Sequence, residues 1–173
     1  MKMKKYLVIW LTGLPCSGKT TLAEIIVKKI NGELLDGDDL RGSDFSKGIG
    51  FSPEARKQHL LRVGYLAGRL SKYAHVVCSF VSPSEDVRNI LPVDLLIYVD
   101  CPVKVCAERD VKGMYAKARA GEIADFTGVD APYEVPQKPD LVVKTHLFSI
   151  NECVNQILKA IFGGTVFTAK NLD

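Results

Sequence analysis

The chain has 173 residues, of which 47% are hydrophobic and 25% are charged. This length and balance are typical of one soluble globular domain, and we expect a single domain over residues 1–173. The net charge of +3 is too small to indicate a nucleic-acid partner, and no apolar stretch reaches the length of a membrane span. Five cysteines without C-x-x-C spacing favour reduced thiols and a cytoplasmic location.

The first pattern along the chain predicts a strand, a glycine-rich loop and a helix. Residues 6–11 are apolar without alternation, which predicts a strand buried on both faces. This run is short and lacks a small-residue cleavage site, so a signal peptide is not expected. Residues 13–20 read Gly-Leu-Pro-Cys-Ser-Gly-Lys-Thr, the G-x-x-x-x-G-K-[ST] pattern of a phosphate-binding P-loop. Residues 19–30 carry apolar side chains at helical spacing.

This order of elements predicts a site for nucleotide phosphates. Backbone N–H groups of the loop and the helix N-terminus would bind phosphate oxygens. Lys19 would reach the β- and γ-phosphates, and Thr20 would place its hydroxyl on Mg²⁺. Cys16 stands where many such loops have glycine, so a negative φ is expected there, and a small unreactive loop residue is favoured over a reactive thiol. We expect ATP to bind at Gly13, Pro15, Cys16, Ser17, Gly18, Lys19, Thr20 and Thr21.

The remaining chain alternates between predicted strands and helices, which indicates an α/β fold with a parallel sheet and helices on both faces. Ser52-Pro53-Glu54 is a typical helix start, and Ser149 with Glu152 forms a capping box. Residues 110–138 are polar, glycine-rich and long for a connection, which predicts a lid. Disorder is expected for residues 165–173. The predicted strands are 33–36, 75–81, 94–100 and 141–144, and the predicted helices are 53–72, 103–109 and 149 to the Gly163-Gly164 pair.

Charged residues after the second predicted strand indicate a second half of the site. Asp36 and Asp38 would face the same way on an extended backbone, at the sheet edge where ligands of such folds bind. One carboxylate would hold Mg²⁺ through water, here assigned to Asp36, and the other would orient or deprotonate an acceptor hydroxyl; a solvated acidic turn is the alternative. Arg41 and Arg56 offer bidentate donors for a phosphate-bearing acceptor, and Phe51 an aromatic face for a base.

Further stretches share one pattern: Leu35-Asp-Gly-Asp-Asp-Leu-Arg41, Gly50-Phe-Ser52, Ser79-Phe-Val-Ser-Pro83, Arg109-Asp-Val-Lys-Gly-Met-Tyr115, Lys117-Ala-Arg-Ala-Gly-Glu-Ile123, Phe126-Thr-Gly-Val-Asp130 and Pro132-Tyr-Glu134. In order and spacing, from about Ile9 to Thr145, they resemble the adenylylsulfate (APS) kinase family of P-loop kinases. The lid stretch is the most specific part of the resemblance.

The resemblance implies a homodimer that uses ATP and Mg²⁺ to phosphorylate the 3′-hydroxyl of adenosine 5′-phosphosulfate, giving 3′-phosphoadenosine 5′-phosphosulfate. It implies catalytic roles for Lys19, Asp38 and Ser82, with Asp38 as a proposed base. Some members are described with a phosphoserine at the Ser82 position, but a hydrogen bond or a helix N-cap before Pro83 explains this serine equally well. The implied acceptor contacts are Asp38, Arg41, Phe51, Arg56, His59, Val81, Ser82, Lys112 and Phe126.

The chain departs from the family pattern on the acceptor side. Asp39 and His59 stand where the family usually has asparagine, and residues 84–90 are shorter and more acidic, with Arg88 as a partial counterpart of a family arginine. These departures favour a second hypothesis, a 3′-hydroxyl kinase for another nucleoside 5′-anhydride such as cytidine diphosphoramidate. A third hypothesis is a nucleotide-binding regulatory protein without turnover, against which the intact Lys19 and Asp38 argue.

Overall fold

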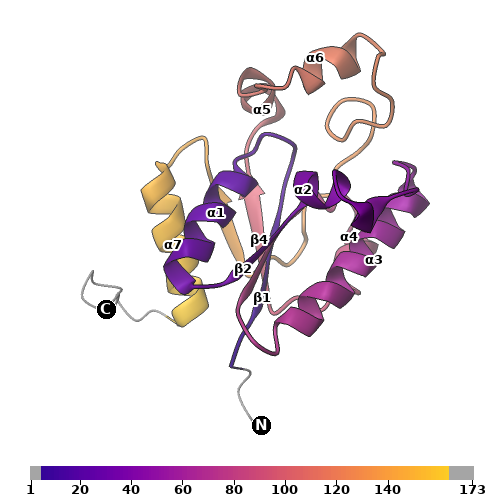
Figure 1. Ribbon diagram of the computed structural model, residues 1–173. Helices are drawn as coiled ribbons and strands as arrows, with labels where there is room; N and C mark the ends of the chain where they lie inside the picture. Colours follow the sequence, from indigo (N-terminus) through magenta and orange to yellow (C-terminus); the bar gives the residue numbers. More distant parts are fainter. Residues whose placement is uncertain (1–4, 164–173) are drawn as a thin grey trace.

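The structure is a computed structural model, which describes residues 5–163; the expected disorder of residues 165–173 lies outside the described part. Within it, five strands form one parallel sheet in the order β2-β3-β1-β4-β5. The predicted α/β class is therefore confirmed. Figure 1 shows the sheet between two layers of helices. The strands are β1 (Val8–Thr12), β2 (Glu33–Asp36), β3 (Val76–Ser79), β4 (Leu95–Asp100) and β5 (Leu141–Lys144).

The two faces of the central strand β1 explain why its sequence does not alternate. Ile9 and Leu11 pack into the core beneath α1 (Lys19–Ile30) and α7 (Ile150–Phe162). Val8 and Trp10 point to the opposite face, into a core shared with α3 (Pro53–Leu70) and α4 (Glu85–Arg88). All of β1 is buried, as predicted for a strand covered on both faces.

Local sequence signals set several helix ends as predicted. Ser52 accepts a hydrogen bond from the Ala55 N–H at the start of α3. Ser149 and Glu152 form the capping box of α7, which ends at Gly163 with φ 66°. Such a left-handed residue favours glycine, because a Cβ is disfavoured there. Helix α3 ends at Leu70, slightly before the predicted residue 72. The leucines at helical spacing in this segment predicted a buried Leu61, but it is exposed.

The lid is more ordered than its polar sequence indicates. It holds α6 (Met114–Arg119), which the sequence did not predict, next to α5 (Val103–Glu108). A separate small core of Cys106, Tyr115 and Phe126 stabilises it. Figure 1 shows these helices above the carboxyl ends of the strands. Two short helices complete the structure near β2, α2 (Gly37–Arg41) and the 3-10 helix η1 (Asp44–Ser46).

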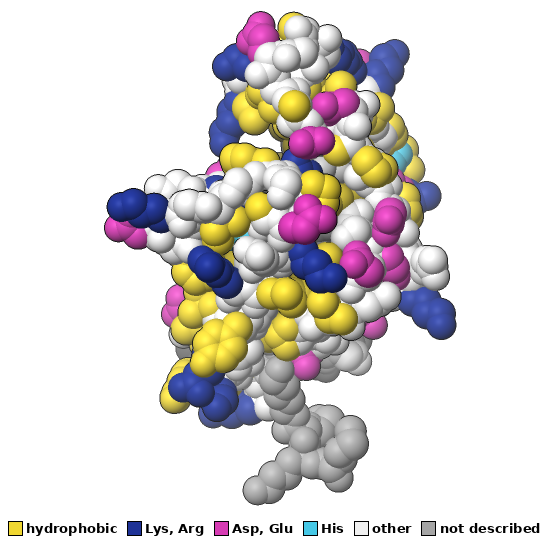
Figure 2. Space-filling view, turned by 90° about the vertical axis from the view of Figure 1, so that its right-hand side faces the viewer, with side chains coloured by type: hydrophobic (Ala, Val, Ile, Leu, Met, Phe, Trp, Pro, Cys, Tyr) yellow, Lys and Arg dark blue, Asp and Glu magenta, His cyan; other side chains and the backbone are white. Residues whose placement is uncertain are grey.

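The face formed by α3 and α4 carries no single patch of one charge. Figure 2 shows Lys and Arg side chains on this face interspersed with acidic and hydrophobic ones, and the lid as the upper part of the molecule. Among the described residues, no helix is long and apolar enough to cross a membrane.

Candidate active site

A cleft of about 1040 Å³ lies at the carboxyl ends of the strands, beneath the lid. The lining comes from the P-loop, the β2–α2 segment, α3, residues 79–83 and the lid. Of the predicted site residues, only Gly13 and Ser17 do not line it. Gly13 lies against the sheet, where a Cβ would come within 2.5 Å of the Val99 carbonyl oxygen, and Ser17 is fully buried.

Lys19 holds the P-loop in a closed turn. Its ammonium is buried and donates to the carbonyl oxygens of Gly13 at 3.0 Å and Leu14 at 2.7 Å. Burial lowers the pKa of Lys19 to about 8, because the charged form loses hydration. Gly18, with φ 100°, caps α1 directly before Lys19. The cation therefore stands in the first turn of a helix whose N-terminal residues line the cleft, and such helix ends favour anions.

Cys16 corrects one expectation from the sequence. It adopts φ 61°, not the expected negative value. The reason is the turn closed by the Ser17 N–H and the Leu14 carbonyl oxygen, which places Pro15 and Cys16 in its centre, where a type II turn needs a positive φ at the second position. Burial and the nearby Asp110 carboxylate raise the pKa of the Cys16 thiol. This shift agrees with an unreactive loop residue.

The geometry of Asp36 and Asp38 differs from the expected extended pair. Asp36 ends β2 and caps α2, where its Oδ1 accepts from the Asp38 N–H at 2.9 Å. Its Oδ2 accepts from the Thr20 hydroxyl at 2.8 Å. Because the chain turns helical at Gly37, the two carboxylates do not share an extended backbone, although both line the cleft. Asp36 is buried, which is unlike the alternative of a solvated acidic turn.

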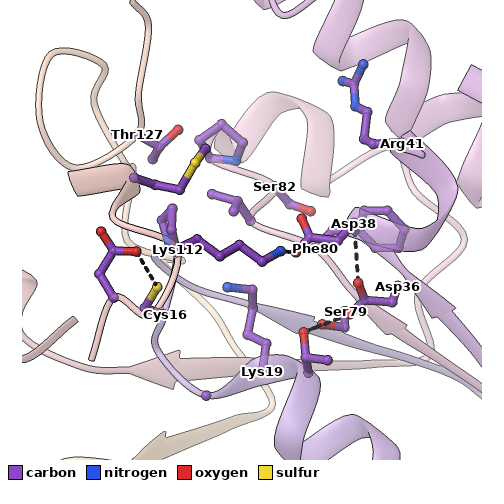
Figure 3. Close-up of a pocket in the computed structure, with 18 of the residues that line it drawn as sticks. Cys16, Lys19, Asp36, Asp38, Arg41, Ser79, Phe80, Ser82, Lys112 and Thr127 are labelled. Atoms are coloured by element: carbon purple, nitrogen blue, oxygen red, sulfur yellow. Dashed lines mark hydrogen bonds and ion pairs between the residues drawn. The ribbon is translucent and has the colours of Figure 1, made fainter. Parts of the chain in front are cut away.

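Lys112 brings the lid to Asp38. Figure 3 shows its side chain extending across the cleft to the Asp38 carboxylate, with Lys19 pointing into the same space. The ion pair raises the pKa of the Lys112 ammonium. The structure therefore joins two residues that lie 74 positions apart in the sequence.

Each of the two predicted arginines holds one segment in place: Arg41 binds residues 49–50, and Arg56 binds the lid. Arg41 donates to the carbonyl oxygens of Ile49 and Gly50 at 3.1 and 2.9 Å, with its guanidinium 4.7 Å from the centre of the Phe51 ring. Arg56 donates to the lid, to the Thr127 hydroxyl at 3.0 Å and to the carbonyl oxygen of Asp125. Phe51 is 63% exposed and lines the cleft.

His59 forms a buried polar part of the cleft wall. It is 3% exposed, and its Nδ1 lies 3.2 Å from the Ser46 hydroxyl. Among the described residues, its Nε2 has no hydrogen-bond partner. Burial, together with the positive charge of Arg41, lowers the pKa of His59 to about 4. The imidazole is therefore neutral near pH 7 and keeps one unused polar atom at the cleft.

Ser82 is turned toward the core. Its hydroxyl oxygen accepts from the Trp10 indole N–H at 2.9 Å, and it is 2% exposed. The alternative of a Ser82 N-cap is wrong, because the residue that precedes α4 is Ser84. Val81 lies beside it, and its carbonyl oxygen accepts from the Thr12 hydroxyl at 2.7 Å. Residues 80–82 leave the sheet, so β3 ends at Ser79, before the predicted residue 81.

Two cleft residues were not singled out from the sequence. Arg109 donates to the hydroxyl and carbonyl oxygens of Thr145 at 3.2 and 2.9 Å. The Thr145 hydroxyl in turn donates to the Ser17 carbonyl oxygen at 2.8 Å. This chain of contacts joins the start of the lid to the P-loop. Arg109 directly precedes the predicted lid and begins one of the family-like stretches, and this position was the signal that could have identified it. Arg88, expected as a partial counterpart of an acceptor-binding arginine, does not line the cleft.

Comparisons with known proteins agree with this geometry. The sequence model described as adenylylsulphate kinase matches residues 5–144. The adenylyl-sulfate kinase of Gloeothece citriformis is 41% identical over 160 residues, covering 87% of this chain and 90% of the relative. That of Chloroflexus aurantiacus is 43% identical over 165 residues, covering 90% and 88%.

The APS kinase of Mycobacterium tuberculosis, solved with AMPPNP and APS, is similar in structure with a TM-score of 0.85. It is 34% identical, and the match covers 91% of this chain and 98% of that one. The chain therefore belongs to the adenylylsulfate kinase family and is an ATP-dependent kinase that transfers phosphate to a hydroxyl.

Proposed function

We propose that this cleft transfers the γ-phosphoryl group of ATP to the 3′-hydroxyl of adenosine 5′-phosphosulfate, with the P-loop holding the donor and the α2–α3–lid side holding the acceptor. One observation supports this division most: Lys19 of the P-loop and Asp38 of α2 point into the same space from two sides (Figure 3). In-line phosphoryl transfer requires donor and acceptor oxygens to meet between such groups.

On the donor side, Lys19 neutralises charge on the transferring phosphoryl group. Its ammonium donates to two loop carbonyl oxygens, which already position it for phosphate oxygens to take their place. Arg109 and Thr145 extend this side beyond the P-loop. The transition state of phosphoryl transfer is loose, so covalent catalysis by the protein contributes little to it. Most of its stabilisation comes from positioning the reactants and neutralising charge on the phosphoryl oxygens.

Mg²⁺ fits the oxygen donors beside Lys19. Thr20 Oγ1 and Asp36 Oδ2 lie 2.8 Å apart at the cleft wall, and hydroxyl and carboxylate oxygens suit this hard cation. Among residues 5–163 there is no group of three or more His, Cys, Asp or Glu side chains arranged as a metal cage. Mg²⁺ in such sites is typically held by one or two protein oxygens, water and substrate phosphates, and Thr20 and Asp36 would supply the protein oxygens here. When bound, the ion would offset charge on the β- and γ-phosphates.

On the acceptor side, Asp38 accepts the proton of the 3′-hydroxyl or orients it for attack. Lys112, now paired with Asp38, would move to the acceptor's phosphosulfate or to the transferring group. Arg41 and Arg56 hold the Phe51 segment and the lid around the acceptor, and Phe51 and Phe126 offer aromatic faces to its base. Val81, Ser82 and His59 form the wall behind it.

Steady-state assays with a panel of nucleoside 5′-anhydrides test this proposal. We expect adenylylsulfate to be used with a kcat/KM about 100-fold above that of cytidine diphosphoramidate and of unsulfated AMP, because the pocket's polar groups would be left unpaired by the others. A Lys19→Ala variant controls for contaminating kinase activity. Turnover of cytidine diphosphoramidate but not adenylylsulfate would support the second hypothesis, and ATP binding without any turnover would support the third.

Two further properties belong to the same proposal. We propose a homodimer, which the family resemblance supports; sedimentation equilibrium that gives a monomer mass at micromolar concentration would contradict it. We also propose a cytoplasmic location, supported by the unpaired cysteines of the described residues. Fractionation of the source cells, with the protein followed by antibody, tests that location.

A further inference from the structure

Arg88 is a buried cation that the proposed chemistry does not use. It is 4% exposed, and its guanidinium forms an ion pair with Glu85 at 2.5 Å. The same guanidinium donates to two backbone carbonyl oxygens, those of Ser82 and Glu134, each at 2.6 Å. Burying a charge is costly unless its donors are satisfied. The guanidinium of Arg88 is therefore held in one orientation by these three partners.

The first carbonyl belongs to a residue in an uncommon conformation. Ser82 has φ 45°, and such a conformation in a non-glycine residue persists only where the surroundings hold it. Trp10 donates to its hydroxyl oxygen at 2.9 Å, and Arg88 donates to its carbonyl oxygen. Thr12 fixes the preceding Val81 carbonyl oxygen at 2.7 Å. Val81 and Ser82 line the acceptor side of the cleft.

The second carbonyl belongs to the segment that ends the lid. The Glu134 N–H donates to the Pro83 carbonyl oxygen at 2.8 Å, and a Glu134 carboxylate oxygen accepts from the Glu85 N–H at 2.6 Å. Next to it, the Tyr133 ring lies 5.7 Å from the Arg88 guanidinium, and its hydroxyl is 2.9 Å from that of Thr12. Arg88 is thus the point where the acceptor wall and the end of the lid meet.

We infer that Arg88 is a positioning residue for the acceptor side: it fixes the conformation of Ser82 and the exit of the lid at once, without touching a substrate. This inference rests on the proposed function of the cleft. A planar guanidinium offers several donors in fixed directions, whereas an ammonium is a single point of charge. Lysine at this position keeps the charge beside Glu85 but cannot reach both carbonyl oxygens with the same geometry.

The contacts of Arg88 also limit where its effect falls. Its guanidinium contacts Glu85, Ser82, Tyr133 and Glu134, and none of these belongs to the P-loop. Lys19 and the Thr20–Asp36 pair are held by other bonds. Removing the guanidinium should therefore disturb acceptor binding and leave ATP binding largely intact. A purely structural residue would instead lower the amount of folded enzyme with both KM values unchanged.

The test compares Arg88→Met and Arg88→Lys with the wild-type enzyme in KM for adenylylsulfate, KM for ATP, kcat and Tm. Removing hydrogen bonds to a charged donor should raise the acceptor KM about 10-fold or more in Arg88→Met and less in Arg88→Lys, with the ATP KM within about twofold. Lys57→Met is a matched control. Lys57 of α3 is an exposed cation, and it pairs with Asp86, which lies in α4 together with Arg88.

The outcomes distinguish a failure of the positioning role of Arg88 from a failure of the proposed function. An unchanged acceptor KM in both folded Arg88 variants, or an equal rise of both KM values, overturns the positioning role. If Arg88→Met does not fold, Glu85→Gln, which removes the charge that orients the guanidinium, must show the same selective rise or the inference is wrong. If the wild-type enzyme does not use adenylylsulfate at all, the proposed function fails instead.

Discussion

Lys112 of the lid and Asp38 of α2 form an ion pair across the mouth of the cleft. Their side chains are 64% and 77% exposed, so water screens the pair and little free energy is lost when it opens. The lid is therefore attached to the proposed base by a contact that an incoming acceptor can replace. An anionic acceptor would attract Lys112 and release the carboxylate for its hydroxyl.

The Asp38→Asn variant tests the role of this carboxylate. Its kcat should fall by about 100-fold or more, which is the range for loss of a general base, while ATP affinity changes by less than about twofold. Asparagine preserves the size of the side chain but not its charge. Steady-state kinetics and ATP titration calorimetry measure the two quantities. Near-wild-type turnover would exclude Asp38 as the base.

The Lys112→Met variant is a separate prediction about the lid. It should raise the KM for adenylylsulfate by about 10-fold, since a charge-assisted contact to the acceptor is lost. Its Tm should stay close to that of the wild type, because the exposed pair contributes little to stability. A loss of Tm with unchanged KM would show that Lys112 acts only within the free lid.

The Ser82→Ala variant separates a hydrogen-bonding serine from a covalent carrier. We expect activity to fall by about 5- to 30-fold, the equivalent of about 1–2 kcal/mol, because the Trp10 indole N–H loses its acceptor and the wall shifts. A phosphoserine intermediate would require the hydroxyl, and alanine would abolish turnover. Mass spectrometry of the wild-type enzyme after incubation with ATP alone should find no phosphate on Ser82.

His59 gives a pH-dependent prediction. With a pKa of about 4 in the folded protein and about 6.5 when unfolded, the unfolded chain binds more protons between these values, so stability falls as the pH drops from 6.5 toward 4. Between pH 7 and pH 5 the wild type should lose about 2 kcal/mol more than His59→Asn in urea unfolding. Equal losses in the two proteins would mean that His59 is not buried as a neutral imidazole.

The conformation of Cys16 predicts the effect of restoring glycine. A non-glycine residue at φ 61° costs about 1–2 kcal/mol, and the greater freedom of glycine in the unfolded chain offsets part of the gain. Cys16→Gly should therefore be more stable than Cys16→Ala by up to about 1 kcal/mol. Alanine is the matched control because it retains the Cβ. A less stable glycine variant would contradict the strain that this turn implies.

The sequence predicts best those features that depend on neighbouring residues. The P-loop, the buried strand β1 and the caps at Ser52 and Ser149 follow from local patterns, and the structure has them. Helix α6 was missed because the lid contains glycines and few apolar residues, and it is held by the distant ring pair of Tyr115 and Phe126, 5.0 Å apart.

The geometry of the candidate site likewise depends on contacts that local sequence patterns do not predict. The expected same-facing pair of Asp36 and Asp38 assumed that the strand continued, whereas Asp36 caps a helix that is only five residues long. The Trp10–Ser82 and Arg88–Glu134 bonds join residues 72 and 46 positions apart. Such bonds depend on the packing of the whole sheet, and no spacing within one segment indicates them.

Trp10 is the single tryptophan of the chain. It lies buried against Phe80, with ring centres 5.3 Å apart, and its indole N–H is bonded to Ser82. Its emission spectrum therefore reports on one place only, the cleft wall at Ser82 on the proposed acceptor side. Intrinsic fluorescence can follow acceptor binding in real time with the unlabelled protein, and the same signal should respond far less to ATP.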